Sequence, residues 1–390
     1  MNLTRQQHKI LEAGAEIFSD RPTSEDTAWM ARQLVQATLP HSDPGDVPAW
    51  GRTNGNLTLT IKPAWDFDPK TNESKCVGVP YGTIPRLLLF WLTTEAIRVK
   101  NRRIELGSSL TDFMFEIGLN PNNGGTGAKR SDARRLKDQM ERLFRSTISF
   151  DYSTVNSSGW LDMQIAPEGF LWWDEKNPDQ GCLFDSWIEL GEKFYQSIIS
   201  SPVPIDLRAL RALKKSPLAL DIYGWATYVT YSVNNSRKPR CVSWDLLHQQ
   251  FGSDYKRICD FRTKALAALK KIKVVYPDLH TENIKGGVKI LPSTTAVLSK
   301  SSANLKKIPS KQKLETSFVT ADLLKELGAA AEISAKAYEK AKQLALDAGT
   351  DWDIRELERQ FQAYANKKGR PTSPDRAFLG FVRKKIQKRP

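Results

Sequence analysis

Apolar and polar positions follow one pattern twice in the middle of the chain, beginning near residue 80. Apolar residues on nearly every side predict a buried helix over Thr83–Val99, followed by a strand at Arg103–Leu106 and a helix at Ser109–Ile117. Ser131–Arg145 carries apolar residues at i, i+4, i+7 and i+8, which predicts an amphipathic helix, and a hairpin turning near Asn156 follows it. This stretch therefore consists of a buried helix, a strand, a helix, an amphipathic helix and a hairpin.

The same order of elements returns in a second stretch, although the two stretches share almost no identical residues. Here the predicted elements are an apolar helix, a strand, a short helix, a long helix and a hairpin, at Ser216–Val233, Arg240–Trp244, Asp245–Phe251, Tyr255–Ile272 and Lys285–Gly287. Gly252 separates the short helix from the long one. This is the order of a helix-turn-helix with a β wing, so we predict an α+β protein with tandem winged-helix domains.

The remaining residues supply a flank on each side. Before the repeat, Glu25–Ala37 has the pattern of a helix and Leu57–Ile61 that of a half-buried strand, whereas Pro63–Ser74 resembles a surface loop. After it, a polar Ser/Thr/Lys-rich stretch predicts a flexible linker before a small all-α module. The predicted division is an N-terminal segment, winged helix 1, winged helix 2, a linker and a C-terminal module, at residues 1–75, 76–204, 205–293, 294–317 and 318–390.

The C-terminal module is predicted from its own periodicity. Four apolar residues share one helix face, and Ser373-Pro374 has the form of an N-cap with proline at the first helical position, opening a last helix towards Ile386. The four residues are Ile354, Leu357, Phe361 and Tyr364.

Length and charge narrow the class of protein. The chain has 390 residues, which predicts two or three globular domains, and its formal net charge is +14. The longest apolar run, Leu87–Leu92, is too short to span a membrane, and residues 1–20 lack the apolar core of a signal peptide. We therefore expect a soluble cytoplasmic protein.

No pattern indicates a catalytic, metal or cofactor site. The four cysteines lie far apart, as do the four histidines, so neither a zinc site nor a disulfide framework is expected. The glycine-rich run Gly124–Ser131 resembles a phosphate loop, but Ala128 separates its glycine from Lys129 and a helix precedes it. We predict that the protein is not an enzyme and has no cofactor. A nickase or a primase is the enzymatic alternative, but this sequence shows none of the residue patterns that such an enzyme needs.

The two long helices of the repeat carry the strongest functional signal. Seven basic and three acidic residues lie within Gly125–Arg145, and ten basic and three acidic within Asn235–Lys273. In the second helix the predicted buried stripe is Ile258, Phe261, Ala265, Leu269 and Ile272. Basic side chains outside such a stripe suit a helix in the major groove, with a basic wing on the phosphates. An ordinary solvated helix face is the alternative for either helix alone. The predicted DNA-binding residues are Lys129, Arg130, Ser131, Arg134, Arg135, Arg142, Arg237, Lys238, Lys256, Arg257, Arg262, Lys264 and Lys285.

A second basic region closes the chain. Nine basic residues and one acidic residue lie within Ala365–Pro390, interleaved with phenylalanines, as in proteins that stack and neutralise single-stranded nucleic acid. A small helical core with a basic tail explains the pattern equally well. The candidates for a single-strand or helicase contact are Lys367, Lys368, Arg370, Phe378, Phe381 and Arg383. For the tryptophans we expect packing in the core or in hairpins, at Trp50, Trp65, Trp160, Trp172 and Trp173.

Several segments resemble the plasmid-encoded RepA replication initiators of Gram-negative bacteria, over about residues 28–293. The segments are Ala31–Pro40, Asp43–Pro48, Val79–Leu89, Arg103–Met114 and Asp138–Phe144. The resemblance implies tandem winged helices that bind repeated duplex sites (iterons) at a plasmid origin, help to open it, and recruit the host initiator and replicative helicase. It also implies a monomer–dimer equilibrium and no membrane partner.

Two points remain open from the sequence. A transcriptional repressor that acts at an operator, including the protein's own promoter, would need the same basic helices, and its dimer would bind inverted half-sites. In the last seventy residues, a small helical domain of replication and primosomal proteins is resembled by Ala335–Lys342, Asp351–Ile354, Leu357 and Ala377–Phe381. This resemblance implies contact with single-stranded DNA or a helicase loader. The tryptophan of that domain is replaced by Phe361 here.

Overall fold

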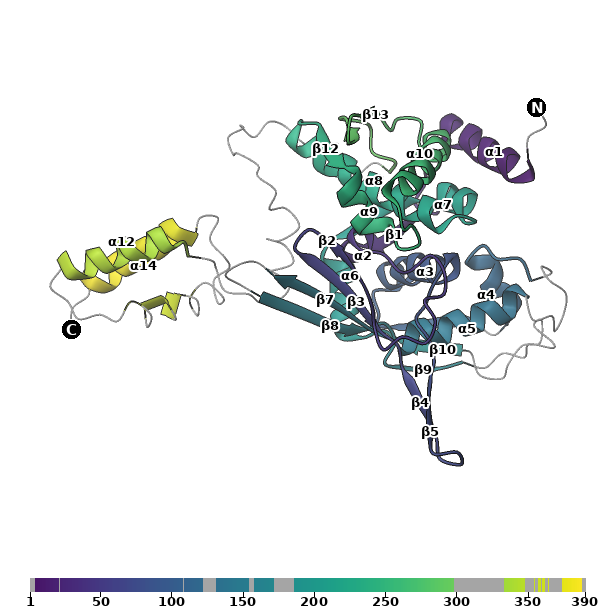
Figure 1. Ribbon diagram of the computed structural model, residues 1–390, viewed down its shortest axis with the longest axis horizontal. Helices are drawn as coiled ribbons and strands as arrows, with labels where there is room; N and C mark the ends of the chain where they lie inside the picture. The colour runs from purple at the N-terminus through teal and green to yellow at the C-terminus, as the bar shows by residue number, and fades with distance from the viewer. Residues whose placement is uncertain are drawn as a thin grey trace. The chain divides into compact units, whose positions relative to one another are not determined.

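The computed structural model divides the chain into two compact units, residues 1–312 and 313–390 (Figure 1). Helices and strands are mixed in the larger unit, which confirms the predicted α+β class. The five-segment division made from the sequence stays a prediction. The residues that the structure describes are 4–20, 22–107, 109–121, 131–153, 158–171, 186–297 and 333–347, together with 354, 357, 358, 360, 361, 364 and 374–387.

Every helix and strand predicted for the first stretch is present. The elements are α3 (Thr83–Val99), β6 (Arg103–Gly107), α4 (Leu110–Glu116), α5 (Asp132–Arg145), β7 (Thr147–Ser153) and β8 (Ser158–Gln164). Ser109 caps α4 and Ser131 caps α5, each accepting a hydrogen bond from a backbone N–H of the first turn. We refer to α4 and α5 as the first helix pair.

Strand pairing joins this stretch to distant parts of the chain. The β7–β8 hairpin extends a four-stranded sheet of order β2-β3-β7-β8, in which β2 (Trp50–Asn54) and β3 (Leu57–Lys62) come from the N-terminal segment. Leu59 lies opposite Phe150 and Ile61 opposite Ile148, and all four side chains are fully buried. Strand β6 pairs instead with β10 (Ser186–Glu189), which also pairs with β9 (Glu168–Phe170). The strand and the hairpin of this stretch therefore lie in separate sheets.

In the second stretch the strand and the hairpin form one sheet. Its elements are α8 (Pro217–Ser236), β12 (Arg240–Ser243), α9 (Trp244–Phe251), α10 (Ile258–Val275), β13 (Thr281–Ile284) and β14 (Gly287–Ile290). The sheet order is β12-β14-β13, with Val242 opposite Val288. We refer to α9 and α10, which lie beside α8 in Figure 1, as the second helix pair.

The N-terminal segment differs most from its prediction. The expected helix over Glu25–Ala37 is wrong, because its first half is strand β1 (Thr27–Ala31) and only α2 (Arg32–Gln36) is helical. Strand β1 pairs with β11 (Pro202–Asp206), and Ala28 and Met30 are buried on alternate positions. Before it, α1 (Arg5–Ser19) packs against α7 (Leu207–Leu213) and α10. Gly14 permits this approach, since a Cβ there would lie 2.5 Å from the Val274 carbonyl oxygen.

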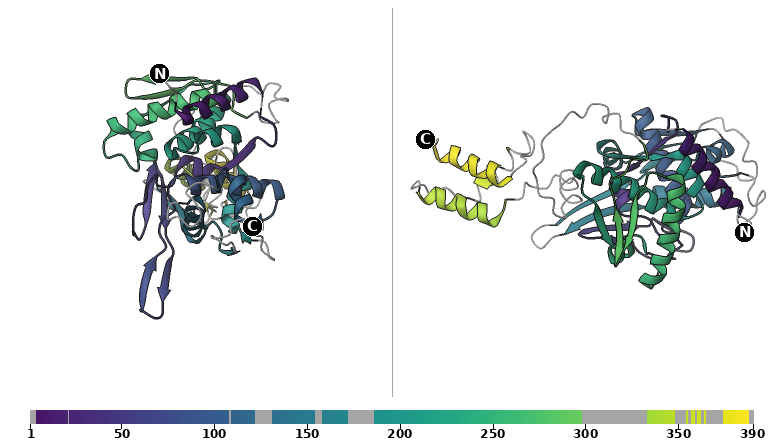
Figure 2. Two further views of the ribbon diagram at one scale, coloured as in Figure 1. Left: turned by 90° about the vertical axis from the view of Figure 1, so that its right-hand side faces the viewer. Right: turned by 90° about the horizontal axis from the view of Figure 1, so that it is seen from above.

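Residues expected to form a surface loop form a two-stranded ribbon instead. Strands β4 (Trp65–Asp68) and β5 (Glu73–Cys76) pair with each other and extend away from the body of this unit (Figures 1 and 2). Trp65 on this ribbon and Trp160 on β8 are exposed, so the expectation that they are packed is wrong. Both side chains face solvent, which the local pattern of the sequence does not reveal.

A buried ionic cluster joins the two stretches. Arg86 of α3 donates from Nε and Nη2 to the two carboxylate oxygens of Asp221 in α8, at 2.7 and 2.8 Å. Its other three N–H groups are directed at the carbonyl oxygens of Leu39, Pro40 and Gly82 at 2.6–3.0 Å. The His41 ring lies 2.9 Å from the same carboxylate. All five guanidinium donors are thus satisfied, as a buried arginine requires.

Burial and charge act in opposite directions on this carboxylate. Removal from water acts to raise the pKa of Asp221, but the charge of Arg86 and the hydrogen bonds from His41 and Arg86 outweigh it. The pKa of Asp221 is therefore held below its usual value, and the carboxylate is the charged partner that Arg86 needs.

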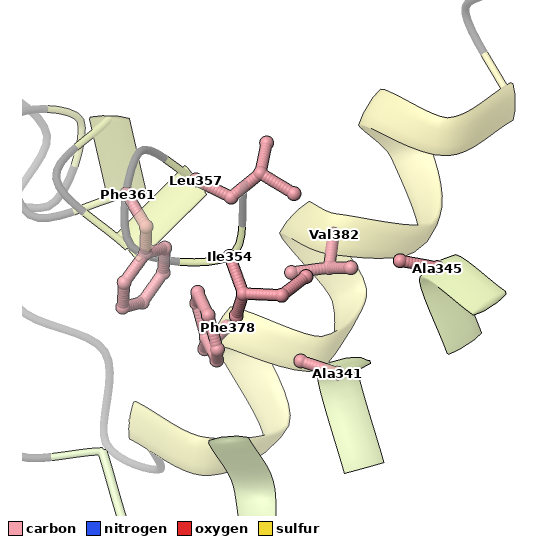
Figure 3. Packing of buried hydrophobic residues seen from close by; sticks show 7 residues of the cluster. All are labelled: Ala341, Ala345, Ile354, Leu357, Phe361, Phe378 and Val382. Atoms are coloured by element: carbon pink, nitrogen blue, oxygen red, sulfur yellow. The ribbon is translucent and has the colours of Figure 1, made fainter. Parts of the chain in front are cut away.

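The C-terminal unit contains a small helical core. Helices α12 (Ala335–Asp347) and α14 (Pro374–Gln387) pack around the cluster shown in Figure 3. The last helix begins at Pro374, as predicted from its cap. Of the four residues predicted to share a face, Tyr364 is exposed and the other three are buried. Residues 298–317 of the predicted linker lie outside the described part of the chain.

Candidate nucleic-acid interface

The turn of the second helix pair is fixed by close packing. Ser243 caps α9 by accepting from the Leu246 N–H at 3.2 Å. Gly252 closes the helix, with its N–H donating to the His248 carbonyl at 2.8 Å, and a Cβ there would meet the His248 ring at 2.3 Å. The Nε2 of His248 lies 2.7 Å from the Tyr255 carbonyl oxygen. Since both sides of the turn are tied to His248, the direction in which α10 leaves α9 is set.

One face of α10 packs into the core and its first turn does not. Phe261, Ala265, Leu269 and Ile272 are buried as predicted. Ile258 was expected to continue this stripe, but it is 39% exposed, so that prediction is wrong. Residues 256–260 are all exposed, because the helix starts only at Ile258 and its first turn projects into solvent. An apolar side chain on such a turn can contact the methyl group of thymine.

The basic side chains just before α10 and in its first two turns are exposed. Lys256, Arg257, Arg262 and Lys264 are all exposed. The Arg262 guanidinium carbon lies 5.8 Å from the centre of the Trp244 ring, and Arg257 pairs with Asp260. The structure therefore brings four of the predicted DNA-binding residues together on the exposed start of one helix.

The β13–β14 hairpin adds one predicted residue at its tip. Lys285 and Gly286 form the turn, in which Gly286 has a φ of +84° that favours glycine. The Gly286 carbonyl oxygen accepts from the N–H of Trp244 at 2.9 Å, so the tip is fastened to the start of α9. Arg237 and Lys238 are exposed at the opposite end of the same sheet, beyond the pairing of Arg240 with Ile290. The structure does not gather them with Lys285.

Two predicted residues of the first helix pair are engaged inside the protein. Ser131 is buried, and its hydroxyl accepts from the Arg134 N–H at 3.2 Å. The side chain of Arg142 is 17% exposed and hydrogen-bonds Asp138 at 3.2 Å, Asp43 at 3.3 Å and the Val79 carbonyl at 3.4 Å. These contacts cap α5 and fasten the N-terminal segment to it. We leave both residues out of the interface for that reason.

The remaining basic residues of α5 divide into paired and unpaired ones. Arg135 pairs with Asp132 at 3.2 Å, while Arg145 pairs with Glu141 at 3.2 Å and with Asp66 of the β4–β5 ribbon at 2.5 Å. Arg134 is exposed and forms no ion pair within the described part of the chain. Lys129 and Arg130 lie outside the described residues.

The candidate contact residues of the C-terminal unit differ in their exposure to solvent. Phe378 is fully buried in the helical core, so it offers no face for base stacking (Figure 3). Phe381 is partly buried and packs against Phe361 and Tyr364, with ring centres 5.7 and 5.8 Å apart. Arg383 is exposed. Lys367, Lys368 and Arg370 fall outside the described residues.

The described residues contain neither a metal-binding cluster nor a membrane-spanning helix. No group of three or more His, Cys, Asp or Glu side chains in that part is placed to hold a metal ion. None of its helices is both long enough and apolar enough to cross a lipid bilayer.

Reasoning from sequence missed one residue of this surface. Asp260 was counted only as a negative charge, yet it hydrogen-bonds the guanidinium of Arg257. The spacing of an acid three residues after an arginine was the available signal.

Part of the chain matches a known protein family. Residues 79–246 match the family model described as plasmid encoded RepA protein. The match begins just before α3 and ends within α9, and it confirms the family resemblance seen in the sequence. No curated protein matches the chain.

Proposed function

Through residues 79–246 the chain belongs to the plasmid-encoded RepA family, and from this premise we propose that it initiates plasmid replication by binding repeated duplex sites at the origin. The family implies a protein of plasmid replication. Binding to duplex DNA is the further step, and the exposed basic start of α10 is the observation that carries it.

The topology of the second stretch supports a winged helix. A helix, a strand, two helices and a hairpin follow one another in α8, β12, α9, α10, β13 and β14, and the first strand pairs with the last. In a helix-turn-helix the second helix enters the major groove with its N-terminal residues on the bases. That helix is α10 here, and the β13–β14 hairpin is its wing.

The charge of this surface suits a polyanion. Lys256, Arg262 and Lys264 have no acidic partner within the described residues, and Lys285 stands at the tip of the wing. Each phosphate that such residues neutralise releases counterions into solution, which favours binding at low salt. The first helix pair adds Arg134 and Arg135 to the same duplex. We include the C-terminal unit as a contact for single-stranded DNA or a helicase, through Arg383 and the basic residues beside it.

The rest of the proposal comes from the family. It comprises help in opening the origin, recruitment of the host initiator and the replicative helicase, a monomer–dimer equilibrium and action in the cytoplasm without a catalytic site.

The test measures binding of the full chain to tandem direct repeats from its plasmid origin. Fluorescence anisotropy across a salt series reports the affinity. Inverted half-sites, scrambled duplex and single-stranded DNA serve as competitors. Neutralisation of about eight phosphates predicts a log–log salt slope near −7. We expect tight binding that depends on the repeats. A preference for inverted half-sites would identify an operator-binding repressor instead, and equal binding to every duplex would contradict sequence recognition.

A further inference from the structure

We propose that Arg257 reads a guanine in the major groove and that Asp260 is the residue that positions it. This inference rests on the proposed function, since it assigns a base to the DNA site. It also adds Asp260, an acidic residue, to a surface otherwise chosen for its positive charge.

The hydrogen bonds between the two residues leave one edge of the guanidinium open. Arg257 Nε donates to Asp260 Oδ2 at 2.8 Å, and Nη2 donates to Oδ1 at 2.8 Å. A guanidinium has five N–H donors, and this fork uses two of them. Both N–H groups of Nη1 and the second of Nη2 take no part in this fork, and one N–H of each nitrogen lies on the far edge. Two parallel donors on that edge match the O6 and N7 acceptors of guanine, the most frequent specific contact of arginine with DNA.

The position of the pair along the helix fits this role. Arg257 is the N-cap residue of α10, and Asp260 is the third residue of its first turn. The side chain of Arg257 is 73% exposed and that of Asp260 50% exposed, so both stand on the turn that would enter the groove. The next residue, Ile258, adds an exposed apolar group beside them.

Local stability does not explain an arginine at this position. The other helices of both pairs begin at a serine whose hydroxyl accepts a backbone N–H, at Ser109, Ser131 and Ser243. Arg257 makes no such bond, and an N-cap residue of this type is unfavourable compared with serine. Exposed ion pairs contribute little to folding. The pair is better explained by a function outside the fold.

Asp260 limits what Arg257 can contact. A long arginine side chain loses rotamer freedom when it binds, and part of that loss has already occurred in the paired state. The Arg257 hydrogen bonds also hold the pKa of Asp260 below its usual range, so the carboxylate stays charged. Without it, Arg257 becomes free to reach phosphates, and one negative charge near the DNA disappears. Loss of Asp260 should therefore raise binding to any duplex while it lowers the preference for guanine.

The experiment measures the base preference of the full chain at every position of its repeat, together with its affinity for scrambled duplex. The variants are Arg257→Lys, which keeps the charge but loses the fork, and Asp260→Asn. Lys264→Ala is the matched control, because it removes a charge from the same helix without touching the pair. Circular dichroism of each variant checks that the fold is retained, as expected for exposed residues.

We expect the wild type to prefer guanine at one position by roughly tenfold or more. Arg257→Lys should abolish that preference. Asp260→Asn should weaken it and raise the affinity for scrambled duplex, whereas Lys264→Ala should lower both affinities and keep the preference. If Asp260→Asn raises all affinities equally, or if Arg257→Lys keeps the guanine preference, the inference is wrong while the proposed function stands. If the wild type shows no repeat-dependent binding, the proposed function fails as well.

Discussion

The two helix pairs occupy equivalent places in the order of elements of their stretches, but their basic side chains have different neighbours. In the first pair, three of the four arginines of α5 contact carboxylates of their own helix or of the N-terminal segment, as Arg142 does with Asp43 and Arg145 with Asp66. In the second pair, the first turn of α10 is exposed, and within the described residues Arg257 is the one basic residue of this region that pairs with an acid. A basic helix is therefore not by itself an interface. Whether a basic helix is available to bind DNA depends on whether the fold places acidic side chains beside its basic ones.

The largest effect on stability is expected at the buried ionic cluster of Arg86 and Asp221, which joins the two stretches. Asp221→Asn should lower the free energy of unfolding by about 3–5 kcal/mol, because it leaves the Arg86 charge buried without its partner. Urea denaturation followed by circular dichroism measures this loss. Asp260→Asn, which alters an exposed pair of the second helix pair, is the control and should leave stability essentially unchanged.

The Asp221→Asn variant should also change how the stability of the protein depends on pH below neutrality. Since the folded pKa of Asp221 is depressed, its contribution is complete above the unfolded value of about 3.9 and is lost as pH falls through the folded pKa. The loss of stability of the wild type below about pH 4 should therefore be shallower in Asp221→Asn. An equally steep acid limb in both proteins would mean that the pKa of this carboxylate is not depressed by folding.

An intermediate effect should distinguish the helix pairs directly. Arg262→Ala/Lys264→Ala in α10 and Arg134→Ala/Arg135→Ala in α5 each remove two exposed positive charges. Removal of two phosphate contacts should reduce the salt slope by about 1.8 and weaken binding about thirtyfold at 0.15 M salt. We expect this for the α10 variant and less than half the change in slope for the α5 variant, by anisotropy. Equal losses would show that both pairs contact phosphates alike and would remove the contrast.

The smallest effect on stability is expected at Ser131, which was predicted from the sequence to bind DNA. Ser131→Ala should cost about 1 kcal/mol of stability through the lost cap of α5, with unchanged affinity for the repeats. Ser243→Ala removes the corresponding cap of α9 and should cost a similar amount. Thermal unfolding and anisotropy together provide the measurement. A weaker affinity of Ser131→Ala at unchanged stability would restore this residue to the interface.

Local periodicity predicted the helices well, because the apolar stripe of a helix lies within a few turns of one segment. It predicted α3, α4, α5, α8, α9 and the end of the chain from Pro374. Pairing between distant strands was not predictable in this way. Nothing near Arg103 indicates that β6 pairs with β10 rather than with the hairpin, since the partner comes about eighty residues later.

The candidate site shows the same limit. The exposed basic face of α10 follows from the helical period, so Lys256, Arg262 and Lys264 could be found from the sequence. The internal contacts of Arg142 could not, because Asp43 is ninety-nine residues away. Phe378 was misassigned for another reason. Alternation of aromatic and basic residues is common to a stacking surface and to a small amphipathic helix, and here the helix buries that ring.

The buried cluster around Arg86 has a consequence for the order in which the chain is made. Its carbonyl partners, at Leu39, Pro40 and Gly82, leave the ribosome before it does, whereas Asp221 follows 135 residues later. At 5–20 residues per second, translation of that interval takes on the order of 10 s. During this time the N-terminal half of the nascent chain holds an arginine whose counter-charge has not yet been synthesised. The charge of Arg86 can therefore be paired with Asp221 only after α8 has emerged.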